Sequence, residues 1–166
     1  MSKMLIKTTF RERLMSSFRM NTKQAAICAV FGALSFAVRA AQLTIPIGGP
    51  FVIDPRGIFV TVGSAFSGPL GGAIIGFLAG IPAKYPICDI PSFAVSGFLV
   101  GLLARRYGWV GGFGMLAGYP IAAAIITALG VLPSFEISFM LLLPRLLVTV
   151  PVEVVVLFAI TRKVKI

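Results

Sequence analysis

The stretch DPRGIFVTVGSAFSGPLGGAIIGFLAGIP at residues 54–82 decides the fold. It is charged only at its start, and it runs apolar on both sides of a Ser67-Gly68-Pro69 turn until Pro82. A bilayer accommodates so long an uncharged run better than water does. Because lipid offers no hydrogen-bonding partners, two helices joined by a tight turn would satisfy the backbone internally. The stretch therefore predicts a helical pair inside a membrane.

Glycines recur every fourth residue in two of the apolar runs. On a helix, this spacing forms a flat stripe where another backbone can approach closely. The stripes predict helix packing by Gly72, Gly76, Gly80, Gly97 and Gly101. For the glycines alone, a packing helix with no chemistry of its own is a sufficient interpretation.

Composition indicates that the whole chain of 166 residues is a membrane domain. Hydrophobic residues make up 58% and charged residues 12% of it, with a mean hydropathy of +1.00. A soluble domain carries about 25% charged residues. We therefore expect a single transmembrane domain over residues 1–166.

The residue types argue against an enzyme. Histidine is absent, which excludes a histidine-based metal site or catalytic triad. The sequence contains no GxxxxGK[ST] phosphate loop, no HExxH and no paired-cysteine motif. Cys28 and Cys88 are expected on opposite sides of the membrane, too far apart for a disulfide. We expect free thiols, no metal, no cofactor and no catalysis by this chain.

Turn and breaker residues divide the chain into spans. The predicted fold is an all-α integral membrane protein, a bundle of six transmembrane helices over residues 22–162. A basic segment at residues 1–21 precedes it, either as a helix on the cytoplasmic leaflet or as a frayed tail. The second span is short, since about 20 apolar residues usually cross a bilayer. The spans are expected near residues 22–42, 58–66, 70–81, 92–104, 110–132 and 137–160.

Charge predicts the orientation. The formal net charge is +10, and eleven of the 15 basic residues lie near the termini or at Arg105 and Arg106. Cytoplasmic segments of membrane proteins carry such an excess. No basic patch is interleaved with aromatic residues in the way that nucleic-acid binding requires. We expect a multi-pass cell-membrane protein with both termini cytoplasmic and no nucleic-acid partner.

Arg145 lies inside the last predicted span. A charge there costs at least about 2.5–3.5 kcal/mol, so such residues usually face a cavity or a partner. Arg145 either binds an anionic ligand group in an outward-facing pocket or forms an internal ion pair with Glu153 or Asp89. The charged residues of the outer loops are either ordinary solvated residues or line the mouth of the same pocket. The candidate substrate-binding residues are Arg145, Asp54, Arg56, Lys84, Asp89, Glu136 and Arg39.

Alanines recur every fourth residue in the first predicted span and leave one helix face nearly smooth. Such a ridge either packs inside the fold or docks a partner helix. The ridge consists of Ala25, Ala29, Ala33 and Ala37.

The size, the six-span plan, the Asp54-Pro55-Arg56 start and the glycine-rich turn at residues 67–72 resemble the substrate-binding S component of energy-coupling factor (ECF) transporters. Ala29 and Ala33 are similar to that family's AxxxA docking motif. The resemblance implies binding of a vitamin or related micronutrient from outside. It also implies delivery through a membrane T subunit, docked on the alanines, and a pair of ATPase subunits.

Two other functions stay open at this point. The chain could act alone as a small permease or channel, or serve as a membrane scaffold without a ligand. The sequence does not identify a substrate. Basic residues near the outer half favour a carboxylate-bearing or phosphate-bearing ligand. The single tryptophan, Trp109, is expected on the cytoplasmic side, which disfavours a pocket built on outer tryptophan stacking.

Overall fold

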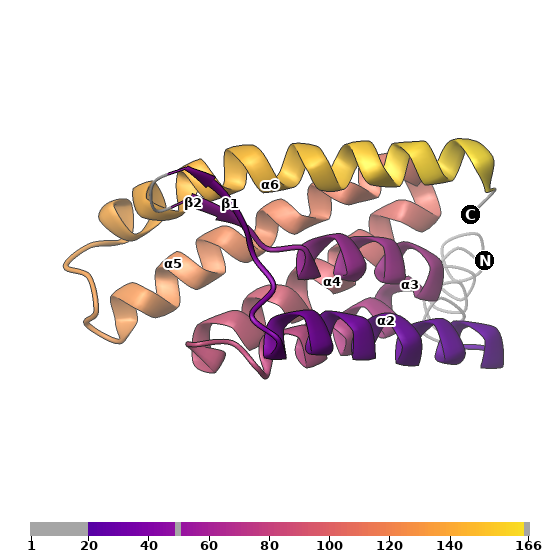
Figure 1. Ribbon diagram of the computed structural model, residues 1–166, viewed down its shortest axis with the longest axis horizontal. Coiled ribbons are helices and arrows are strands. Elements are labelled where there is room, and N and C mark those ends of the chain that lie inside the picture. The colour runs from indigo at the N-terminus through magenta and orange to yellow at the C-terminus, as the bar shows by residue number, and fades with distance from the viewer. Residues whose placement is uncertain (1–19, 49–50, 165–166) are drawn as a thin grey trace, which may run out of the picture.

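The computed structural model describes residues 20–48 and 51–164. Its helices lie alongside one another in one elongated bundle, with a small hairpin laid across the first part of the last helix (Figure 1). The expected amphipathic helix of the basic segment falls outside the described residues. In chain order the elements are α2 Thr22–Ala40, β1 Ile45–Gly48, β2 Phe51–Ile53, α3 Arg56–Gly80, α4 Pro86–Tyr107, the 3-10 helix η1 Gly108–Ala117, α5 Gly118–Ala128 and α6 Phe135–Lys163.

The prediction of six transmembrane helices is wrong. The described residues contain four helical stretches that are long and apolar enough to cross a membrane, which makes this a membrane protein. The second and third expected spans form one element, α3, and the fourth and fifth belong to one continuous run of helical residues, α4, η1 and α5. Each half of α3 is only about 18 Å long at 1.5 Å per residue, which is short of a hydrocarbon core of roughly 30 Å. The four stretches are Thr22–Ala40, Arg56–Gly80, Pro86–Ala128 and Phe135–Lys163.

The chain reverses direction within α3 at the turn that the sequence predicted. Gly68 has φ +83° and ψ −172°, a conformation that glycine adopts without a Cβ clash. The reversal packs the two halves of α3 against each other. The evidence is that a Cβ on Gly63 would lie only 2.8 Å from Cδ1 of Ile75. On a straight helix, Gly63 and Ile75 would be about 18 Å apart along the axis, so their contact shows that the chain folds back.

A second reversal follows α4. Gly108 has φ +61° and ends that helix. The next segment returns along α4 at very close range, since a Cβ on Gly111 would lie 2.6 Å from the Cβ of Ala104. Gly118 contacts Ser96 just as closely. Glycine is needed on this face because any larger side chain would separate η1 and α5 from α4.

Glycines also form the contact between the second half of α3 and α4. A Cβ added to Gly72 would collide with the carbonyl of Gly97, and the reverse is also true. Gly76, Gly80 and Gly101 are each blocked in the same way by backbone atoms across this contact. All five packing glycines singled out from the sequence therefore lie where two backbones meet. The same contacts bring the first turns of α4 beside the end of α3, and Arg56 at the start of α3 bonds to both Ala79 and Asp89 there.

Helix α2 lies at the edge of the bundle. Cys28, Gly32 and Ser35 face inward and are buried, while most of the other side of this helix is uncovered. Cys28 and Cys88 are both free and buried, which confirms the prediction of two free thiols.

The expected loop between α2 and α3 instead contains a two-stranded antiparallel hairpin. Ile45 pairs with Ile53 and Pro46 pairs with Val52, with an irregular step before Gly48. The hairpin lies beside the first part of α6 (Figure 1). The second strand ends at Ile53, directly before Asp54, which is the first residue in the chain that lines the pocket.

Candidate functional site

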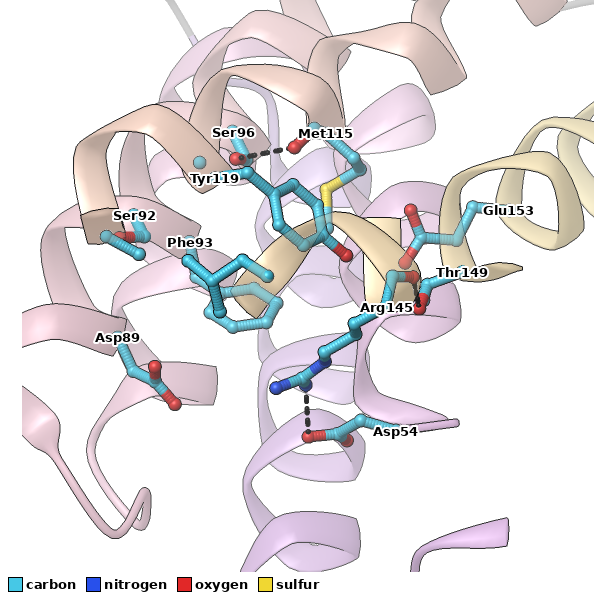
Figure 2. Close-up of a pocket in the computed structure, with 14 residues that line it drawn as sticks. Asp54, Asp89, Ser92, Phe93, Ser96, Met115, Tyr119, Arg145, Thr149 and Glu153 are labelled. Carbon is cyan, nitrogen blue, oxygen red and sulfur yellow. Dashed lines mark hydrogen bonds and ion pairs between the residues drawn. The ribbon is translucent and has the colours of Figure 1, made fainter. Parts of the chain in front are cut away.

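A pocket lies among the start of α3, α4, η1, α5 and α6 (Figure 2). Its cavity volume is about 60 Å³, which is well below the roughly 300–1,000 Å³ of typical small-molecule sites. The pocket as it stands is therefore narrow, and it suits a small or flat molecule.

Asp54 is the centre of an ion-pair network at one side of the pocket. This side chain is only 4% exposed, and its Oδ2 lies 2.7 Å from Nε of Arg56. The two groups form an ion pair, but the Nε–H of Arg56 makes no hydrogen bond. The same oxygen lies 3.2 Å from Nη2 of Arg145 and 4.0 Å from Nη1 of Arg39. One carboxylate thereby joins α2, α3 and α6.

Arg56 is 1% exposed and fully engaged by the protein. Its Nη2 donates to Oδ2 of Asp89 at 2.6 Å, and its Nη1 donates to the carbonyl of Ala79 at 3.0 Å. Its guanidinium also lies over the ring of Phe93, 4.2 Å from the centroid. Arg56 therefore ties both ends of α3 to α4, and it has little left to offer a ligand.

The network is close to neutral. Three arginines face two aspartates, so the net charge is +1, and Arg145 is the most exposed member, with 34% of its side chain exposed. The internal partner of Arg145 is Asp54, so the expected alternatives of a pair with Glu153 or Asp89 are wrong. Among the described residues, no three carboxylates or thiols are grouped in a way that could hold a metal ion.

Glu153 forms part of the opposite wall. Its side chain is buried, with 1% of the residue exposed, and its Oε2 has no hydrogen-bond partner. The carboxylate lies against Gly57, where any Cβ would collide with it. Figure 2 shows the carboxylate of Glu153 directed toward the side of the pocket where Tyr119 and Thr149 lie. The sequence signal for this residue was its position as the sole acid inside a span, but its partners were left open.

Hydroxyl groups line the rest of the polar wall, and they donate to the backbone. Thr149 donates to the carbonyl of Arg145 at 2.6 Å, and Ser96 donates to that of Met115 at 3.4 Å. Ser92 donates to the carbonyl of Cys88. Each hydroxyl oxygen then keeps lone pairs as acceptors, so this wall is richer in acceptors than in donors.

The seven candidate substrate-binding residues separate into two groups. Five join the network around Asp54, and three of these, Asp54, Asp89 and Arg145, line the pocket itself. Lys84 instead lines a second, surface hollow, shared with Arg39 and Gln42. Glu136 lies in the first turn of α6 and lines neither space.

The alanine ridge of α2 lies on the uncovered side of that helix. Its four members are exposed, and no other described residue covers them: Ala25, Ala29, Ala33 and Ala37. The inward face of α2 is a different one, made of Cys28, Gly32 and Ser35. The ridge is therefore free to contact lipid or another protein.

Comparisons with protein-family models, with curated proteins and with solved structures found no match. The function must therefore be argued from the pocket, the uncovered ridge and the sequence pattern.

Proposed function

We propose that this chain is the substrate-binding S subunit of an ECF-type importer in the cell membrane. It binds a vitamin-like small molecule in the pocket beside Asp54 and Glu153, and it docks through α2 onto a T subunit that carries two ATPases. The observation that supports this most is the pairing of an open, polar-walled pocket with a smooth, uncovered alanine ridge on one small membrane domain. Neither feature alone favours a transporter over a scaffold.

Charge supports an outward-facing pocket with both termini cytoplasmic. Of the six described basic residues outside the network, five lie at the start of α2 and at the ends of α4 and α6, which are at one end of the bundle (Figure 1). The sixth, Lys84, lies in the loop before α4. Asp89 lies in the first turn of α4, at the opposite end of that helix. By the positive-inside rule the basic end is cytoplasmic, so the mouth of the pocket faces outward.

The ridge suits a helix–helix contact in the membrane. Lipid tails are as apolar as leucine side chains, so transmembrane helices associate chiefly where small residues let backbones come close. Ala29 and Ala33 are consecutive members of the ridge near the middle of α2. They form the centre of the proposed contact with the T subunit.

Bulky residues on the ridge test this function. The double variant Ala29→Trp with Ala33→Trp should fold, because both positions are exposed, but should no longer co-purify with a T subunit and two ATPases from native membranes. Leu34→Trp is the matched control, because Leu34 is exposed on the same helix about 100° from Ala33. An intact complex carrying both tryptophans would contradict the proposal.

A stand-alone permease would behave differently. In liposomes without any ATPase, the purified chain should carry no net flux of the small molecule that co-purifies with it, as native mass spectrometry would identify it. Sustained flux under those conditions would favour the permease over the importer subunit.

A further inference from the structure

We propose that the ligand of the pocket carries a cationic nitrogen with N–H donors, such as an amine or an amidine, and that Glu153 holds this group. The inference rests on the proposed function, because it assigns a ligand class to the same pocket. It differs from the expectation raised by the basic residues of the sequence, which favoured an anionic ligand.

The first argument is that Glu153 lacks a partner. The residue is 1% exposed, and its Oε2 makes no hydrogen bond. No lysine or arginine of the described residues lies within ion-pairing distance of its carboxylate. Burying an acceptor or a charge without a partner is costly. A group that enters the pocket and donates to this carboxylate would remove that cost.

The second argument is that the nearby cations are already engaged. Arg56 is shared among Asp54, Asp89 and the carbonyl of Ala79. Arg145 faces Asp54 on the other side of the pocket. Arg56 cannot turn to Glu153 without breaking its ion pair with Asp89, and Arg145 could do so only by giving up its hydrogen bond to Asp54.

The third argument is that the wall beside Glu153 offers acceptors. Thr149 uses its hydroxyl proton on the carbonyl of Arg145, so its oxygen presents lone pairs. Tyr119 extends its hydroxyl group toward the same side (Figure 2). A ligand nitrogen with several N–H groups matches this arrangement of acceptors.

The fourth argument concerns the body of the ligand. Phe93, Met115 and Leu142 supply apolar wall, and the free space is narrow. One face of the Phe93 ring is already covered by Arg56. A flat ring carrying the nitrogen group fits these constraints better than a bulky or highly charged molecule.

The test compares three small probes of matched shape: benzamidine, neutral benzamide and anionic benzoate. Each is added at millimolar concentration to the purified full chain in lipid nanodiscs, and binding is followed by ligand-observed NMR. We expect benzamidine to bind about 10-fold more tightly than either other probe, the usual effect of a charge-assisted hydrogen bond. Glu153→Gln should abolish this preference. Glu136→Gln, on the same helix but outside the pocket, should leave it unchanged.

Equal or tighter binding of benzoate would overturn the inference, as would undetectable binding of benzamidine or an unchanged preference in Glu153→Gln. If that variant does not fold, the order of the three probes on the natural chain decides the matter alone. Probe binding needs no T subunit or ATPase, so the two proposals fail separately. If the chain prefers benzoate, the ligand inference fails but the importer proposal stands. If the chain prefers benzamidine but does not assemble with a T subunit, only the importer proposal fails.

Discussion

At the scale of single residues, Asp54 is the side chain on which the site depends. One buried carboxylate faces three guanidinium groups contributed by α2, α3 and α6. Removing one partner of a buried ion pair is far more costly than the net stabilisation from the pair, because the remaining charge stays buried. The network therefore fixes where α2 and α6 lie relative to the start of α3.

Asp54→Asn should destabilise the protein severely. Arg56 would stay buried with its charge only partly compensated by Asp89, and breaking a buried pair costs about 3–5 kcal/mol. Thermal unfolding of the purified chain in detergent measures the effect, with Glu136→Gln as the control that removes an equal charge outside the network. A melting temperature of Asp54→Asn equal to that of the control would show that the network is not what holds these helices.

The sequence predicted which charges are unusual but not which ones meet. Asp54, Asp89 and Arg145 were expected near one mouth because all were assigned to the outer side. Their pairing depends on how far each helix rotates about its own axis, which no local pattern specifies. Glu153 was compared with Arg145 on its own helix, whereas its carboxylate lies against Gly57 of α3.

At the scale of elements, glycine decides how closely the helices approach. In the contact of α3 with α4, carbonyls of one helix lie where the side chains of the other would be. Close packing of this kind drives helix association in lipid, where the hydrophobic effect does not. The pocket depends on it, because Ser92, Phe93 and Ser96 face the pocket from the helix that these glycines hold in place.

Gly76→Ala should separate α3 from α4. The new Cβ would collide with the backbone of Phe93, which cannot move aside as a flexible side chain would. Overpacking of this kind costs about 1–3 kcal/mol, and it should also weaken ligand binding. Thermal unfolding again measures the loss.

Gly130→Asn provides the matched comparison. Gly130 has φ +69°, and nothing lies within 4 Å of the place that a Cβ would take there. Asparagine tolerates that backbone conformation. The unfolding temperature of this variant should stay close to that of the natural chain. Equal destabilisation by both substitutions would mean that the close α3–α4 contact is not a special constraint.

Element boundaries were predictable only where local chemistry dictates them. The turn at Gly68 was predicted because a Gly-Pro pair interrupts an apolar run. Helix α4 was expected to start near Ser92 but begins at Pro86, because proline is tolerated in a first helical turn. The hairpin of β1 and β2 was missed because Pro46 and the glycines around it are typical of an irregular loop.

At the scale of the whole molecule, the basic ends of α4 and α6 lie away from the pocket residue Asp89, which is in the first turn of α4. The basic ends of α4 and α6 lie together, while the connection between α5 and α6 lies at the other end of the bundle (Figure 1). This asymmetry gives the proposed orientation a direct chemical test. Cys28 and Cys88 are buried, so the natural chain should react little with a thiol reagent and can serve as the background control.

Tyr107→Cys and Val131→Cys place single accessible thiols at the two ends, since these positions are 53% and 65% exposed. In intact cells, a membrane-impermeant maleimide should label Val131→Cys and should leave Tyr107→Cys unlabelled until the membrane is permeabilised. The reason is the positive-inside rule, which places Arg105 and Arg106 beside Tyr107 in the cytoplasm. The reverse pattern would turn the pocket toward the cytoplasm, where it could not collect a substrate for uptake, and the importer proposal would fail with it.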